Sequence, residues 1–181
     1  AMDETLQRAL WEESVSNAIA AALLAKLVGG VDRSRAYTAG LLQNIGRLVL
    51  ESHLRREAAE IERVEATGVS RLEAERAVLG VDHAEVGARL CEHWGFPAVL
   101  CDTVRHHHEP ERAELDPALC YAVHLGEQVS QSLTQEKDPT QPRYPIASGA
   151  LERLHLAEGA LEGLQVLLVR ELDRAREFVE A

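Results

Sequence analysis

The sequence has 181 residues and a formal net charge of −11, with 30 acidic and 19 basic side chains. This charge excludes nucleic acid and anionic membrane surfaces as expected partners, because carboxylates repel phosphate and no basic stripe overrides the repulsion. The length suits one domain, which we place at residues 3–181.

The composition is typical of a helical protein. Hydrophobic residues make up 46% of the chain but aromatic residues only 4%, so the core must be packed with Leu, Ala and Val. Small and unbranched side chains of this kind suit close contact between helices. Runs that alternate β-branched with polar residues, which would predict strands, are missing. We therefore predict an all-α fold.

Three cysteines, Cys91, Cys101 and Cys120, are odd in number and form no CxxC pair. This pattern argues against a disulfide framework and for a reducing compartment, so we predict a cytoplasmic location. We interpret the cysteines as small apolar core residues. No stretch reaches the roughly 18 consecutive apolar residues of a membrane span.

Apolar residues at helical spacing predict three helices in the first third of the chain. The first covers residues 3–27 and stops at Gly29-Gly30. The second covers about 33–53, where Gly40 and Gly46 indicate close packing or a break. The third covers about 54–66.

The middle of the chain carries strong helix-boundary signals. Ser70-Arg71-Leu72-Glu73 matches a capping box that opens a helix ending at Gly80. Asp82 caps the following helix, which Gly95 closes. Pro97 fits the first turn of a helix that continues through the three histidines until Pro110.

The last part of the chain predicts a helix from Asp116-Pro117 to about Leu133, a proline-rich loop over 134–147 and C-terminal helices over 148–181. An apolar stripe indicates that the final helix is amphipathic. It comprises Leu161, Leu164, Leu168, Leu172, Ala175 and Val179. We expect this stripe to dock on the bundle, with pairing to a second copy as a homodimer kept as the alternative.

The histidines suggest a metal site. His106-His107-His108 ends one predicted helix and His83 begins the one before it, so antiparallel packing would bring His83 close to His107 or His108. Imidazoles from facing helices are common metal ligands in bundles. Two structural interpretations stand beside this one. His83 would cap or pack its helix, and the histidine run would be stabilised by the helix C-terminus. For His124 we see no partner.

Five motifs in register resemble the HDOD family over about residues 5–130. They are Leu10-Trp11-Glu12-Glu13-Ser14, Ala39-Gly40-Leu41-Leu42-Gln43-Asn44-Ile45-Gly46, Leu79-Gly80-Val81-Asp82-His83-Ala84-Glu85-Val86-Gly87, Trp94-Gly95-Phe96-Pro97 and His106-His107-His108-Glu109-Pro110. The resemblance implies an HD-domain-like helical bundle, related to the HD and HD-GYP phosphohydrolases, found in bacterial regulatory proteins and generally regarded as lacking hydrolase activity. The family's usual N-terminal helical half is essentially absent here, which predicts a fragment or a shorter variant.

The same resemblance implies a dismantled metal site. Glu13 or a neighbour stands where active relatives have their first His, Gln43-Asn44 replaces the His-Asp pair, and Glu127 replaces the late Asp, whereas His83 and the His107-His108 pair are unchanged. A neutral Asn cannot bridge two cations as a carboxylate does. We expect no catalytic residue, no cofactor and no bound metal. His83, His107, His108 and Glu127 remain as vestigial metal candidates, although we interpret Glu127 as a carboxylate at a buried edge or in solvent.

These observations predict a non-catalytic bacterial signal-transduction module that acts through an unknown protein partner or a small ligand in the vestigial groove. The alternative is a metal-dependent phosphohydrolase or phosphodiesterase with an altered metal site. A third hypothesis is a purely structural or dimerising helical domain.

Overall fold

A computed structural model describes residues 4–135, 146–157 and 159–180, and every regular element in these ranges is a helix. The all-α prediction is confirmed. The elements are α1 (Glu4–Val28), α2 (Arg33–Leu42), α3 (Ile45–His53), α4 (Arg55–Glu65), α5 (Arg71–Leu79), α6 (His83–His93), α7 (Ala98–His106), η1 (Pro110–Arg112), α8 (Pro117–Gln135), α9 (Ala150–Arg153) and α10 (Ala160–Glu180).

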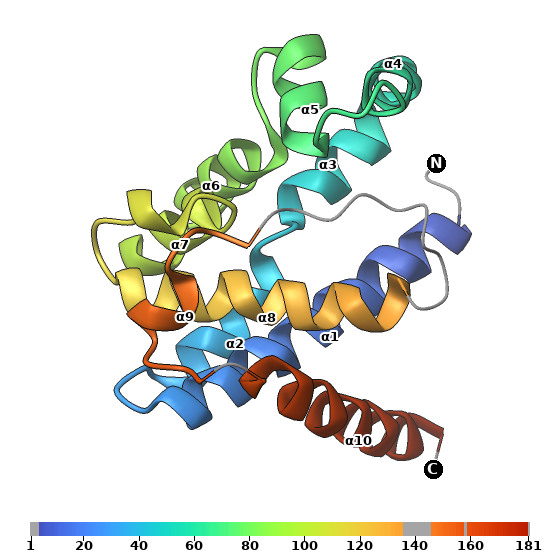
Figure 1. Cartoon of the computed structure of the whole chain (residues 1–181). Coiled ribbons are helices and arrows are strands. Elements are labelled where there is room, and N and C mark those ends of the chain that lie inside the picture. Colours follow the sequence, from blue (N-terminus) through green and yellow to red (C-terminus); the bar gives the residue numbers. More distant parts are fainter. Residues whose placement is uncertain (1–3, 136–145, 158, 181) are drawn as a thin grey trace.

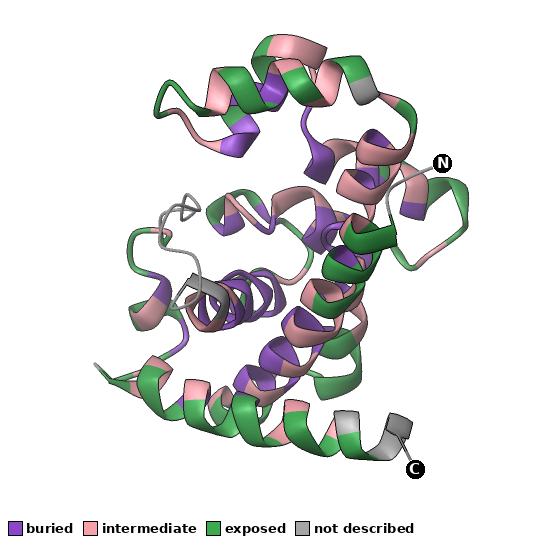
Figure 2. Ribbon diagram, turned by 90° about the vertical axis from the view of Figure 1, so that its right-hand side faces the viewer, coloured by how far each residue is buried: buried purple, intermediate pink, exposed green. Residues whose placement is uncertain are grey.

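The bundle is organised around two long helices, α1 and α8, which pack against each other and against α2 (Figure 1). α10 lies along the outer side of α1 and α8, while α6 and α7 form an adjacent helical pair. The α4–α5 pair projects at the far end, where α3 joins it to the bundle. α8 is central, since residues 119–130 are all buried (Figure 2).

The sequence-predicted caps are confirmed. Ser70 and Glu73 form the complete capping box of α5, and Gly80 ends that helix with a left-handed φ of 73°. The Asp82 carboxylate accepts a hydrogen bond from the Glu85 amide at 2.9 Å and so begins α6. Asp116 caps α8 in the same way. These boundaries follow from local chemistry, because each cap satisfies amide groups that the first turn leaves unpaired.

Two predicted helices differ from the structure. The stretch 33–53 is two helices, α2 and α3, that break at Gln43-Asn44 and not at a glycine. Gly40 and Gly46 instead mark close approaches, since a Cβ at Gly40 would lie 2.8 Å from the Asn17 carbonyl oxygen. The helix expected to run through the histidines to Pro110 ends at His106. Residues 107–109 form a turn and a bend, and the short 3-10 helix η1 follows at Pro110–Arg112.

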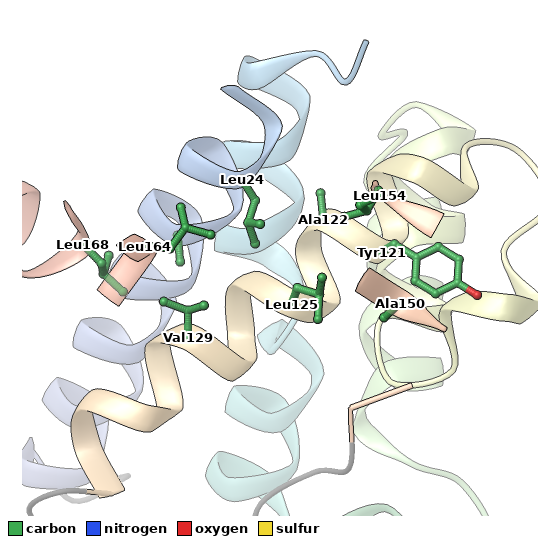
Figure 3. Packing of buried hydrophobic residues seen from close by; sticks show 10 residues of the cluster. Leu24, Tyr121, Ala122, Leu125, Val129, Ala150, Leu154, Leu164 and Leu168 are labelled. Carbon is green, nitrogen blue, oxygen red and sulfur yellow. The ribbon is translucent and has the colours of Figure 1, made fainter. Parts of the chain in front are cut away.

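The C-terminal prediction is confirmed where the structure describes it. Leu164 and Leu168 of α10 are buried against Leu24, Leu125 and their neighbours in one apolar cluster (Figure 3). The stripe therefore docks on its own bundle, as expected, over Leu161, Leu164, Leu168 and Leu172. α8 continues to Gln135, two residues beyond the predicted end, and residues 136–145 of the predicted loop lie outside the described part of the chain.

Cys91, Cys101 and Cys120 are buried thiols with no disulfide, which agrees with their interpretation as core residues. Burial raises the pKa of the Cys91 thiol to about 11, so this thiol stays protonated at neutral pH. Among the described helices, none combines the length and the apolar character needed to cross a bilayer.

The closest helix crossing that concerns the site lies between α3 and α6, at Gly46. A Cβ at this position would overlap the His83 carbonyl oxygen and lie 2.6 Å from the Gly87 nitrogen. We expect Gly46→Ala to lower the free energy of unfolding by about 3 kcal/mol, because both clashing groups are backbone. Gly163→Ala on α10, where nothing lies within 4 Å, should raise it by roughly 0.5–1 kcal/mol. Chemical denaturation measures both, and equal effects would contradict the crossing.

Candidate functional site

Three histidines converge where α6 begins and α7 ends. His83 is the first residue of α6, and His107 and His108 follow the last residue of α7. One ring nitrogen from each lies within 4.8 Å of those of the other two. The predicted convergence of His83 with the histidine pair is therefore found, and it includes both members of the pair.

The hydrogen bonds of two rings determine where their hydrogens lie. His83 Nδ1 lies 2.7 Å from Glu75 Oε2, and His107 Nδ1 lies 2.7 Å from the Val104 carbonyl oxygen. Both oxygens only accept, so each Nδ1 donates and each Nε2 faces the cluster. His83 Nε2 and His108 Nε2 are 3.0 Å apart, so one hydrogen lies between them. His107 Nε2 is buried and makes no hydrogen bond within the part of the chain that the structure describes.

Burial and mutual repulsion keep two of these imidazoles neutral. Burial, reinforced by the neighbouring His83, lowers the pKa of His107 to about 3. Burial also lowers the pKa of His108 well below its ordinary value, with the charge of His107 as the next cause. His107 and His108 therefore present neutral nitrogen donors at pH 7, which is the protonation state in which imidazole binds a metal.

Glu75, which the sequence did not single out, orients His83. Glu75 of α5 is fully buried, and its Oε2 accepts hydrogen bonds from both the His83 amide, at 2.8 Å, and the His83 ring. Burial alone would raise the pKa of Glu75, but the hydrogen bonds and charge of His83, together with Arg71, lower it to about 2. Glu75 is thus a buried carboxylate anion against the back of the His83 ring.

Arg71 holds Glu75 in place and ties three helices together. Its guanidinium bonds Glu75 of α5 at 3.0 Å, Glu51 of α3 at 2.6 Å and Glu65 of α4 at 3.4 Å. The spacing of Arg71 and Glu75, four residues apart on one helix, indicated an ion pair in the sequence. Nothing in the sequence indicated that the pair is buried or that it touches His83.

A second group of polar residues lies beside the histidines. Asn44 donates from its Nδ2 to Glu13 Oε1 at 3.1 Å and to Glu127 Oε1 at 3.5 Å, and Arg47 bonds the other oxygen of Glu13 at 3.3 Å. Glu127 Oε2 is 3.5 Å from His108 Nδ1, which joins the two groups. The positions that the resemblance aligned with the old metal site are thus brought together.

Glu127 lies at no edge and not in solvent, so that interpretation is wrong. Its side chain is fully buried on the central helix α8. Burial, and then the charge of Glu13, raise its pKa to about 8. The hydrogen bond from Asn44 and the charge of Arg47 lower the pKa, but by less than burial and Glu13 raise it, so the protonated carboxyl is favoured at neutral pH.

His124 has partners that the sequence did not reveal. Its Nδ1 donates to the His107 carbonyl oxygen at 2.8 Å, and its Nε2 accepts from the Ala147 amide at 2.9 Å. Both nitrogens are therefore used in holding the backbone of the site and the segment before α9. His124 has no nitrogen left for a ligand.

The side chains present fit one metal ion and not two. Three imidazole nitrogens are a common donor set for a single transition metal. A two-metal centre needs a bridging carboxylate, and Asn44 supplies an amide at the position where the resemblance places that group. The surface hollows around Arg33 and Tyr37 contain none of these residues.

The arrangement of these helices is that of an HD-like helical domain. A profile of the HDOD domain matches residues 2–110, so the chain belongs to the HDOD family.

Solved structures share this fold. A provisionally named phosphohydrolase from Shewanella amazonensis SB2B is 27% identical with a TM-score of 0.68, over 88% of this chain and 58% of its own. An HDOD domain protein of unknown function from Geobacter sulfurreducens is 25% identical with a TM-score of 0.66, over 94% of this chain and 59% of its own. A provisionally named signal transduction protein from Marinobacter aquaeolei VT8 is 23% identical with a TM-score of 0.76. The match covers 91% of this chain and 37% of that protein.

An uncharacterized protein from Treponema pallidum (strain Nichols) is 28% identical over 104 residues. The match covers 56% of this chain and 20% of that protein. The chain therefore spans only part of the length of the relatives it matches.

The raised pKa of Glu127 predicts a pH-dependent stability. The pKa of Glu127 in the folded protein, about 8, exceeds the ordinary value of 4.5, so folding is coupled to uptake of a proton by this carboxyl. The resulting stabilisation of the folded protein is fully present below about pH 4.5 and is lost as the pH rises through about 8. Glu127→Gln mimics the protonated form and still accepts from Asn44. Its unfolding free energy relative to wild type should therefore rise by about 1 kcal/mol per pH unit between pH 5 and 8.

Denaturant unfolding at several pH values measures this slope. The matched control is Glu62→Gln on α4, where the carboxylate is exposed, and its difference from wild type should stay flat. A flat difference for Glu127→Gln as well would show that the Glu127 carboxyl is ionised in the folded protein.

Proposed function

We propose that this chain is a non-catalytic bacterial signal-transduction module that acts by binding a small ligand or a protein partner. The single observation that carries the proposal is the role of Asn44. Its amide donates to the carboxylates of Glu13 and Glu127 where a hydrolase of this type needs a metal-bridging carboxylate. A neutral side chain, Asn44, thus links Glu13 and Glu127 by hydrogen bonds.

The electrostatics of the site support the same proposal. Activation of water between two metal ions requires ionised carboxylates that offset the ionic charge. Burial raises the pKa of Glu127 to about 8 without a bound ion, so ionising this carboxyl for a metal would oppose binding at pH 7. Glu13 is engaged by Arg47 and Asn44. Membership in the HDOD family adds the associational argument that such domains occur in bacterial regulatory proteins.

The second candidate function is a metal-dependent phosphohydrolase or phosphodiesterase. The observation in its favour is the histidine cluster, which keeps three convergent nitrogen donors. The Shewanella amazonensis protein, 27% identical, carries the provisional name of a phosphohydrolase. A single ion with a bound water would be its minimal catalyst.

We further propose a cytoplasmic location, which the three reduced, buried cysteines support. The net charge of −11 supports a partner that is neither nucleic acid nor an anionic lipid surface. The partner protein or ligand would approach the side of the bundle where α6, α7 and α8 bring the site residues together.

A hydrolysis assay separates the two functions. The purified chain, supplied in turn with manganese, iron and zinc, is tested on bis(p-nitrophenyl) phosphate and on a cyclic dinucleotide. We expect wild type to match the metal blanks and the His107→Ala variant, because the bridging carboxylate is missing. Turnover that depends on metal and is lost in His107→Ala, but kept in the exposed His93→Ala control, would refute the non-catalytic proposal.

A further inference from the structure

We propose that His83, His107 and His108 together hold one divalent transition metal ion, with the buried Glu75 as the outer carboxylate that aims His83 at it. This inference rests on the proposed function and deepens it, because the ion would be the ligand of the regulatory module. The first ground is convergence, since one nitrogen of each ring lies within 4.8 Å of the other two.

The second ground is the orientation of the donors. The Nδ1 hydrogens of His83 and His107 are engaged by Glu75 and by the Val104 carbonyl. Their Nε2 atoms therefore carry lone pairs on the side of the cluster. His107 Nε2 is fully buried and has no hydrogen-bond partner. Burying an acceptor without a partner costs about 1–3 kcal/mol, and an ion bound at this nitrogen would supply the missing interaction.

The third ground is an excess of negative charge behind His83. Three carboxylates, from Glu51, Glu65 and Glu75, surround the single guanidinium of Arg71. The sum of these formal charges is negative, and Glu75 directs its second oxygen at His83. A carboxylate that accepts from the far nitrogen of a ligating imidazole fixes the ring and makes it a stronger donor. The charge and the geometry therefore both favour a cation on the opposite side of the His83 ring.

The donor set selects the kind of ion. Three imidazoles suit zinc, cobalt or nickel, whereas magnesium and calcium prefer oxygen ligands. Three protein ligands also leave a coordination position for water or for a ligand of the signalling function. Binding through His108 Nε2 requires the hydrogen that lies between His83 Nε2 and His108 Nε2 to move to His108 Nδ1, so the imidazole changes tautomer and stays neutral.

The test uses the full chain, stripped with a chelator and titrated with zinc chloride in competition with a chromophoric chelator. We expect one zinc per chain by elemental analysis and a rise in the thermal unfolding midpoint with added zinc. His107→Ala should lose the ion. His93→Ala removes an exposed histidine of α6, the helix that begins with His83, and should keep the ion.

The role of Glu75 has its own matched control. Glu75→Gln should weaken zinc binding roughly 10–100-fold, the usual effect of removing an outer carboxylate. Glu51→Gln removes another partner of Arg71 but does not touch His83, and should leave the affinity within about 3-fold. Equal losses in both variants would show that the carboxylates act only through the stability of the α4–α5 pair.

A measurement on wild type guards against variants that fail to fold. Cobalt(II) added to the stripped chain should give a d–d absorption band of three-nitrogen coordination, and zinc should abolish it. No band together with no stoichiometric zinc overturns the inference and leaves the proposed function standing. Bound metal without turnover supports both, whereas bound metal with turnover keeps the inference and refutes the non-catalytic function.

Discussion

The Glu75 carboxylate is the interaction on which the site depends. It is fully buried, bonded on one side to Arg71 and on the other to the amide and ring of His83. Removing either partner would leave a charge buried without compensation, which costs several kcal/mol. The same carboxylate therefore holds α5 against the start of α6 and determines the direction of the His83 ring.

The site has two halves with different electrostatics. The histidine half has the buried Glu75 anion behind His83 and keeps His107 and His108 neutral, so it favours a cation. In the other half, Glu13 and Glu127 both contact the neutral Asn44. Burial and the charge of Glu13 raise the pKa of Glu127 to about 8. An Asp in place of Asn44 would add a third carboxyl and would require a bound cation to be tolerated. In this chain the Asn44 amide links the two carboxyl groups by hydrogen bonds.

The fold places these halves on one side of the bundle. Glu127 lies on α8, which runs through the core. Asn44 lies in the break between α2 and α3, beside Glu127. Because Gly46 and Gly87 allow α3 and α6 to touch through their backbones, the start of α6 comes close to that break. We propose that a domain with this geometry and without the bridging carboxylate acts by binding and not by hydrolysis.

The sequence by itself determined the all-α class, the family resemblance, the helix boundaries at Ser70, Gly80 and Asp82, and the convergence of His83 with the histidine pair. Local chemistry sets the helix class and the helix boundaries, because caps and helical periodicity act within a few residues. The convergence could be predicted because the two helices are neighbours in sequence and are joined by a short turn. Only the tertiary structure decided that α2 and α3 break at Gln43-Asn44, that Glu127 is buried and protonated, and that Arg71 and Glu75 support His83. Burial and contacts between helices distant in sequence produce these features, and composition and spacing carry no measure of either.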